Sequence, residues 1–180
     1  MFFMGAIMPE ELTPTKDALE TLNAFYREMG RIASSWGALE FLIDQTIWKL
    51  AGLDDKPGAC LTAQIIAIHG RSRALVSLMN LRGIDAELIK EVNRFTGKAA
   101  ETAQHRNRIV HSPLMLDETM SKVMKFSIKA DRQLEFDSSI VDFDYAAKTL
   151  NQISDHLVEF DKLKSAILAA YVPSPDKSLK

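Results

Sequence analysis

Apolar residues recur mainly at spacings of three and four along the first fifty residues, and this pattern constrains the fold more than any other feature of the sequence. A helix places such residues on one face, so a stripe of this length predicts one long helix that packs lengthwise in a bundle. Thr13 before Pro14 predicts its start, because a capping hydroxyl precedes a proline at the first helical position. Gly52 predicts its end. The stripe consists of Leu22, Phe25, Met29, Ile32, Trp36, Ile43, Ile47 and Leu50.

A second apolar stripe covers about residues 61–81 and predicts another helical stretch, which Gly83 ends and which Gly70 can divide in two. The segment 54–58, Asp-Asp-Lys-Pro-Gly, has the composition of a loop and separates this stretch from the first helix. Whether the second stretch is divided decides how many helices precede the middle of the chain.

A third helix is expected from about Asp85 to His111. It has to end there, because Pro113 disfavours the helical conformation for Ser112. The side chains of its stripe are expected to face the same core as those of the first helix. The stripe consists of Leu88, Val92, Phe95, Ala99, Ala103 and Val110.

The spacing of apolar residues changes to two within about residues 120–137, and a polar turn at Asp131-Arg132 divides this segment. This pattern predicts a β-hairpin. Asp144 then predicts the cap of a last helix that ends near Tyr171. The expected fold is all-α, an up-and-down helical bundle of four to five helices with a small β-hairpin inserted before the last helix.

The composition fits one globular domain over residues 13–171. A chain of 180 residues, 47% hydrophobic and 26% charged, can bury about 70% of its unfolded surface in one core. Cys60 is the only cysteine, so the chain cannot form an internal disulfide. A reducing, cytoplasmic location is therefore expected.

The two ends of the chain are expected to lie outside this domain. Residues 1–12 are apolar at first but lack basic residues and are shorter than the roughly 20 residues of a membrane span. They are expected to be a mobile leader, with Met4 and Met8 as alternative starts. Residues 172–180, with two prolines and a charged end, are expected to be a disordered tail.

Charge is unevenly distributed along the sequence. The chain has a net charge of −2, whereas residues 71–108 carry eight basic and four acidic side chains, hence +4, and the remainder carries −6. Such a basic middle indicates a local anionic ligand rather than a general coat for nucleic acid. Solvated helix faces are an equally good interpretation of the same charges.

The segment 105–111, His-Arg-Asn-Arg-Ile-Val-His, concentrates the residues that can carry chemistry. On a continuous helix Arg106 and His111 would lie about 140° apart around the axis. If the helix ends before Pro113, the imidazole can approach the guanidinium at an open helix end. Asn107 and His111 lie four residues apart and share a face.

Arg106 falls on the apolar stripe of its helix, so it needs an acidic partner. Glu40 occupies an apolar slot of the first helix between Trp36 and Ile43, and an unpaired carboxylate there would be costly. We therefore predict a contact of Glu40 with Arg106 or with another arginine. A buried ion pair without a catalytic role is the alternative explanation of both residues.

Other polar residues give weaker indications. Arg71 and Arg73 can add phosphate contacts or be ordinary surface charges, and Arg108 and His105 are further candidates for RNA contacts. His105 either faces solvent or joins the groove. His156 is expected to be structural. The histidines and the cysteine have no zinc-ligand spacing, and no phosphate-binding glycine loop occurs in the sequence.

The Arg-Asn pair that is followed by three residues and a histidine, at residues 106–111, resembles the R-x4-6-H signature of the HEPN superfamily. These are all-helical domains of bacterial toxin and defence systems and of several RNA-cleaving enzymes. Trp36 and Glu40, one turn apart on an early helix, and a last long helix after a short insertion resemble the same group. The resemblance covers about residues 16–171.

This resemblance implies a metal-independent endoribonuclease that needs no cofactor. Arg106 and His111 match the catalytic pair of the family, and Asn107 matches its polar companion. The resemblance also implies a homodimer with the site at its interface, RNA as substrate, and an antitoxin partner if the chain is the toxin of a toxin–antitoxin or phage-defence system. An imidazole suits removal of the 2′-hydroxyl proton, and a guanidinium suits the charge that develops on the phosphoryl oxygens.

The sequence departs from the family at Pro113, where some toxin members carry a tyrosine that a partner nucleotidyltransferase modifies. That modification is therefore not expected here. Other members keep the fold but serve as non-catalytic nucleotide-binding, RNA-binding or protein-interaction modules. A structural dimer held together by its arginines is a third hypothesis.

Overall fold

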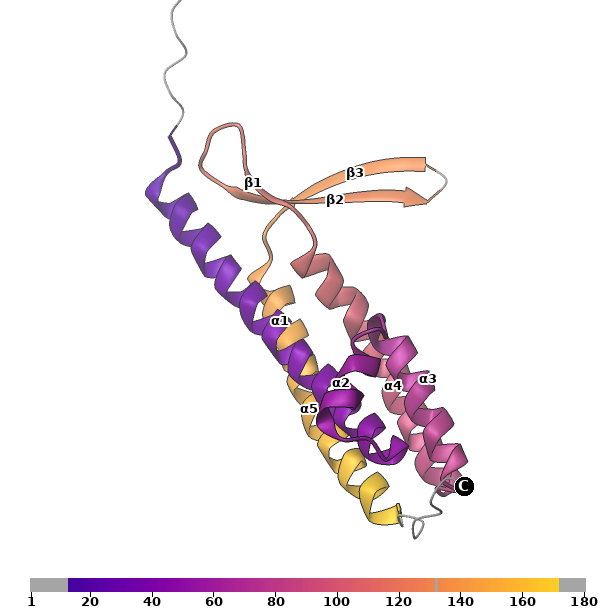
Figure 1. Ribbon diagram of the computed structural model, residues 1–180. Coiled ribbons are helices and arrows are strands. Elements are labelled where there is room, and N and C mark those ends of the chain that lie inside the picture. Colours follow the sequence, from indigo (N-terminus) through magenta and orange to yellow (C-terminus); the bar gives the residue numbers. More distant parts are fainter. Residues whose placement is uncertain (1–12, 132, 172–180) are drawn as a thin grey trace, which may run out of the picture.

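The computed structural model describes residues 13–131 and 133–171. Its elements are α1 (Lys16–Ala51), α2 (Asp55–Thr62), α3 (Ala67–Leu81), α4 (Ala86–Val110), β1 (Leu114–Leu116), β2 (Val123–Asp131), β3 (Gln133–Ile140) and α5 (Phe143–Ala170). The helices form a bundle, and the antiparallel sheet lies across one end of it (Figure 1). The predicted all-α bundle with an insertion before the last helix is confirmed, although the insertion is a three-stranded sheet. The expected leader (1–12) and tail (172–180) lie outside the described residues.

The long helix α1 begins two residues later than predicted. Thr15, not Thr13, is its N-cap, and the Thr15 Oγ1 accepts a hydrogen bond of 3.2 Å from the backbone N–H of Ala18. Pro14 precedes the cap instead of opening the helix, so the proline rule placed the start too early. Gly52 ends α1 as predicted, with a φ of 71° that a residue without Cβ adopts at little cost.

The second helical stretch divides, but not at Gly70. α2 occupies part of the segment 54–58 that was predicted to be a loop, and the break between α2 and α3 falls at residues 63–66. Tight turns after α2 account for the break, since the N–H of Ile65 bonds back to the carbonyl of Thr62 at 2.9 Å. Ala67 then enters α3 with a positive φ of 66°, which no side-chain pattern signals.

α2 packs closely on α1 at Gly58. A Cβ added to Gly58 would lie 2.4 Å from Cγ of the buried Trp48 ring, which donates a hydrogen bond to Thr62. Only glycine therefore allows the two helices to approach this closely. Gly97, by contrast, is exposed on α4, and a Cβ there would have no neighbour within 4 Å.

These two glycines predict opposite effects of the same substitution. Gly58→Ala should lower the free energy of unfolding by about 1–3 kcal/mol, because the added methyl group overpacks the contact with Trp48. Gly97→Ala should raise it by about 0.5–1 kcal/mol, because alanine is the better helix former at an open position. Urea denaturation of both variants checks the pair. Equal signs would contradict this account of the α1–α2 contact.

The core lies between α1, α3, α4 and α5, each of which contributes fully buried side chains. Large rings fill it, and the rings of Phe95 and Phe160 pack with centroids 5.2 Å apart. The predicted stripe of α4 holds over its first half, and Ala99 is fully buried. In its second half the buried positions are Thr102 and Ile109, not Ala103 and Val110, which are half-buried. The buried positions of α4 thus keep the spacing of one helical face along the whole helix, and the expected stripe departs from them after Ala99.

The sheet has the order β1-β2-β3 and extends the predicted hairpin in both directions. β1 follows directly on Pro113, whose carbonyl accepts a hydrogen bond of 3.0 Å from Phe126. The β2–β3 ribbon continues to Ile140 and projects beyond the bundle in Figure 1. Asp142, not Asp144, caps α5 by accepting a 2.8 Å hydrogen bond from Tyr145 N–H. None of the described helices is long and apolar enough to cross a membrane.

Candidate functional site

The C-terminal end of α4 brings Arg106 and His111 together. His111 is the C-cap, with a φ of −104° and a ψ of −1°, and its N–H bonds to the carbonyl of Asn107 at 3.0 Å. The hydroxyl of Ser112 donates to the carbonyl of Arg108 at 2.7 Å, so the helix end is satisfied locally. From this position the Nε2 of His111 lies 3.1 Å from the Nη1 of Arg106. Two side chains that an uninterrupted helix would separate are thus in contact.

Chemistry assigns the protons in this contact. A guanidinium has donors only, so Arg106 donates and the Nε2 of His111 accepts. In this hydrogen bond the lone pair of Nε2 faces the guanidinium, as in the imidazole tautomer with its N–H at Nδ1. The same Nη1 donates to Oδ1 of Asn107 at 2.8 Å, whereas the buried Nε of Arg106 has no hydrogen-bond partner in the described part of the chain. Arg106 retains donor capacity for a further acceptor.

Arg106 and Asn107 line an open cavity of about 370 Å³ between three helices. α4 contributes a wall that includes Ala100 and Ala103, whose small side chains leave the space open. The sequence had no signal for this arrangement, because the cavity depends on how the three helices pack. The lining also includes Trp36 and Glu40 from α1, His69 from α3 and Gln104 from α4.

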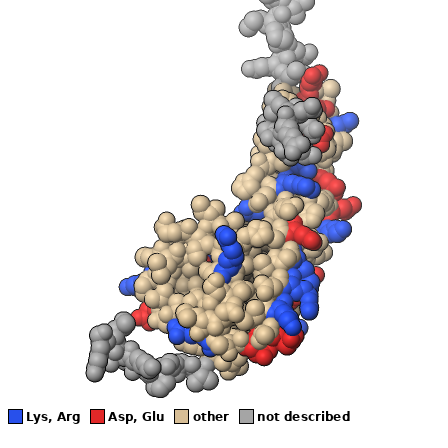
Figure 2. Space-filling model, turned by 90° about the vertical axis from the view of Figure 1, so that its right-hand side faces the viewer, with Lys and Arg blue, Asp and Glu red and all other residues tan. Residues whose placement is uncertain are grey.

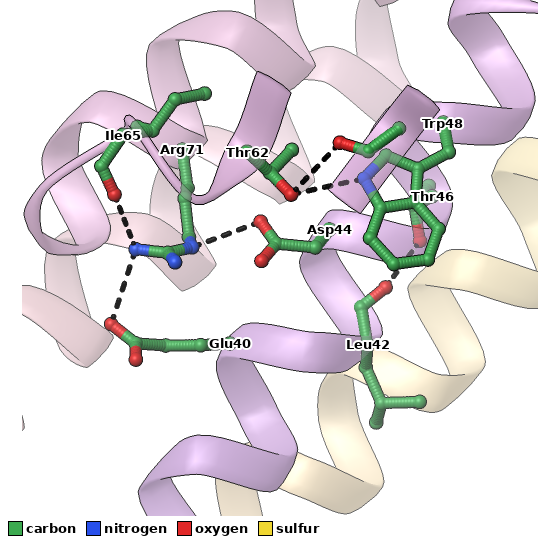
Figure 3. Close-up of polar contacts among 9 residues, drawn as sticks. Glu40, Leu42, Asp44, Thr46, Trp48, Thr62, Ile65 and Arg71 are labelled. Atoms are coloured by element: carbon green, nitrogen blue, oxygen red, sulfur yellow. Dashed lines mark hydrogen bonds and ion pairs between the residues drawn. The ribbon is translucent and has the colours of Figure 1, made fainter. Parts of the chain in front are cut away.

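Glu40 meets an arginine, as predicted, but the partner is Arg71 and not Arg106. The Nη1 of Arg71 lies 3.5 Å from the Glu40 carboxylate. Figure 3 shows the same guanidinium joining Asp44 of α1, at 2.9 Å through Nε, and the carbonyl of Ile65, at 2.8 Å through Nη1. Only 13% of the Arg71 side chain is exposed. Arg71, a candidate for RNA contacts, is therefore committed to holding the α2–α3 connection on α1.

The remaining candidates lie around this cluster. Nδ1 of His105 is 2.7 Å from the Tyr145 hydroxyl of α5, so His105 neither faces solvent fully nor enters the cavity. Arg73 and Arg108 are exposed on α3 and α4 and make no described ion pair. No group of three or more metal-ligating side chains occurs within residues 13–131 and 133–171.

Charged side chains are mixed on the side of the molecule where α3 and α4 lie. This side faces the viewer in Figure 2, in which uncharged side chains cover much of the bundle and basic and acidic ones alternate along one edge. The excess of basic residues between positions 71 and 108 does not form a continuous basic surface on this face. A local site for an anion fits this distribution better than a broad nucleic-acid coat.

His156 is buried where α4 meets α5, and its Nε2 lies 2.9 Å from the Thr102 hydroxyl oxygen. Burial, the largest effect, lowers the pKa of His156, while the charges of Glu159 and Asp155 raise it and that of Lys98 lowers it. The Nδ1 has no hydrogen-bond partner among the described residues. These contacts give His156 a place in the core as a neutral imidazole.

The lowered pKa of His156 predicts a pH dependence of stability. The unfolded chain takes up a proton near the ordinary value of 6.5, whereas the folded chain resists protonation. The contribution of His156 to the free energy of unfolding should therefore be fully present above about pH 6.5 and should decrease as the pH falls below this value. His156→Gln should lack this part of the decrease. Urea denaturation of both proteins from pH 8 to pH 5 measures the difference, and a difference that is independent of pH would contradict the assignment.

Comparison of the chain with protein-family models, with curated proteins and with solved structures gives no match. The site itself combines an imidazole, a guanidinium with free donor capacity and a cavity that begins at the same guanidinium.

Proposed function

We propose that this chain is a metal-independent endoribonuclease in which His111 and Arg106 act on the phosphodiester. The observation that carries the proposal is the 3.1 Å contact between Arg106 Nη1 and His111 Nε2, which places an imidazole beside a guanidinium at a solvent-open helix end. A neutral imidazole is a general base, and a guanidinium matches the oxygens of a phosphate. The resemblance of residues 106–111 to the HEPN signature supports the same reading.

In the proposed reaction the substrate phosphate first draws the Arg106 guanidinium away from His111. The charge-assisted contact with an anion is stronger than the bond to a neutral imidazole. The lone pair of His111 Nε2 then accepts the proton of the ribose 2′-hydroxyl. The 2′-oxygen attacks phosphorus, the bond to the 5′-oxygen breaks, and the products carry a 2′,3′-cyclic phosphate and a 5′-hydroxyl. Arg106 stabilises the charge on the non-bridging oxygens, and Asn107 orients Arg106 through its 2.8 Å hydrogen bond.

A homodimer belongs to this proposal because the reaction needs an acid as well as a base. His111 starts the reaction as the neutral base, so a second, protonated imidazole is best suited to donate a proton to the leaving 5′-oxygen. In two copies that face each other with their α4 ends, the second His111 supplies this proton from its imidazolium form, after its own Arg106 has turned to the phosphate. An antitoxin that covers this helix end would fit a toxin–antitoxin or phage-defence system, in which such an activity has to be restrained.

The test is cleavage of an unstructured RNA by the purified chain in EDTA. Cleavage should occur in the chelator and should leave 2′,3′-cyclic phosphate ends, which a phosphatase that does not open the cyclic ester cannot remove. Absence of cleavage by a folded protein would reject the proposal. RNA binding without cleavage would instead support a non-catalytic binding module, the alternative in which Arg106 keeps His111 occupied.

A further inference from the structure

The cavity beside Arg106 contains charged side chains of both signs, which the proposed cleavage chemistry alone does not explain. Its volume of about 370 Å³ lies within the roughly 300–1,000 Å³ of small-ligand sites. Its walls include Trp36 and the small side chains of Ala100 and Ala103. The charged residues among its described lining are Arg106 on α4 and Glu40 on α1. A ligand that fills the cavity therefore meets a cation at one place and a carboxylate at another.

Glu40 has unused acceptor capacity in this cavity. Its contact with Arg71 is 3.5 Å long, whereas Arg71 holds Asp44 at 2.9 Å and the Ile65 carbonyl at 2.8 Å. A carboxylate has about four acceptor positions, so one long contact leaves most of them free. The side chain is 26% exposed, and the residue lines the cavity. Glu40 can therefore accept N–H groups from a ligand.

We propose that the cavity is a nucleobase subsite that selects guanine from the nucleotide whose phosphate lies at Arg106. The inference rests on the proposed function for its link to RNA cleavage. Among the four RNA bases only guanine presents two adjacent N–H donors, at N1 and N2, and these match the two oxygens of one carboxylate. The Glu40 carboxylate takes this edge of the base, and the amide of Gln104, which also lines the cavity, can donate to O6.

The other bases fit this arrangement less well. Adenine and cytosine place a ring acceptor beside their amino group, which would face the negative charge of Glu40. Uracil flanks its single N–H with two carbonyl oxygens. A bidentate contact of this kind is worth about 1–3 kcal/mol of discrimination, which corresponds to a factor of about 5–150 in affinity.

The first experiment measures binding without cleavage. The four nucleoside 3′-monophosphates and the four 5′-monophosphates are titrated into the full chain by isothermal titration calorimetry. We expect a guanosine monophosphate to bind about tenfold or more tightly than the other nucleotides. Equal affinities for the four bases, or no binding of any nucleotide, would overturn the subsite.

Two variants locate the binding in the cavity. Glu40→Gln should reduce the affinity for guanosine monophosphate about tenfold or more, and Glu20→Gln, on an exposed part of α1, should not change it. Ala103→Leu should block the cavity and abolish nucleotide binding. Its control is Ala86→Leu, at an exposed position of α4. Unchanged affinity in both cavity variants would overturn the proposal.

The fold is expected to survive these changes, because Arg71 keeps Asp44 and the Ile65 carbonyl when Glu40 loses its charge. Circular dichroism checks this, and Ala103→Leu decides the question if Glu40→Gln does not fold. Cleavage sites on an RNA of mixed sequence separate the subsite from the proposed function. Cleavage without preference for guanine would overturn the guanine subsite but would support the proposed ribonuclease activity. Guanine-selective binding without cleavage would support the subsite and overturn the proposed activity.

Discussion

Replacing His111 with alanine should lower the rate of RNA cleavage by about 10²–10⁴-fold, because the reaction then loses its general base. Arg106→Ala should lower it by about 10²–10³-fold through loss of charge stabilisation at the phosphate. Both effects are expected in the rate of bond breaking under saturating RNA. Single-turnover assays in EDTA, with quantification of the 2′,3′-cyclic product, measure them.

The control for these variants is Arg94→Ala, which removes an exposed charge from the same helix. It should leave the single-turnover rate within about twofold, since an exposed charge so far from the helix end contributes only screened electrostatics. In the double variant of Arg106 and His111, the loss of rate should be far smaller than the product of the two single losses, because the two residues act on one step. A rate that persists in both single variants would assign the cleavage to other residues.

The second large effect is expected from Arg71→Ala, on stability instead of activity. Removing the guanidinium leaves the carboxylate of Asp44, of which 11% is exposed, without its partner at 2.9 Å. It also removes the donor from the carbonyl of Ile65. Breaking such a partly buried pair on one side should lower the free energy of unfolding by about 3 kcal/mol. Urea denaturation with circular dichroism detection gives the value.

Arg73→Ala is the matched control, because Arg73 lies two residues further along α3 and is exposed. Its effect should stay within about 0.5 kcal/mol. Adding Asp44→Asn to Arg71→Ala should recover part of the loss, since the unpaired charge is then removed. If Arg71→Ala and Arg73→Ala destabilise the chain equally, Arg71 is not the anchor of the α2–α3 connection.

Proline positions and helical periodicity predicted those features of the structure that a short stretch of sequence determines. The end of α4 follows from Pro113, and the approach of His111 to Arg106 follows from that end. Glu40 in an apolar slot required an arginine, but helical periodicity cannot say which helix supplies it. The answer depended on the α2–α3 connection, which was predicted to be helical and in fact turns sharply before Ala67.

The cavity could not be predicted for the same reason. Its walls come from three helices, and Ala103 is a half-buried residue beside the buried stripe of α4 that lines the cavity. A one-dimensional pattern does not tell whether a neighbouring helix covers such a position. Alanine at positions 100 and 103 was compatible with close helix packing and with an open cavity, and only the assembled bundle distinguishes the two.

Arg106 and His111 belong to one helix end, whereas the cavity needs α1, α3 and α4 together. The contact between them therefore depends on the last turn of α4, and helix ends are among the first parts of a fold to open. The walls of the cavity depend instead on Arg71 and the short connection that it anchors to α1. The contact of Arg106 with His111 is thus a local feature, whereas the cavity is a feature of the whole bundle. Fraying at His111 would separate the two side chains, and loosening of the α2–α3 connection would open the cavity.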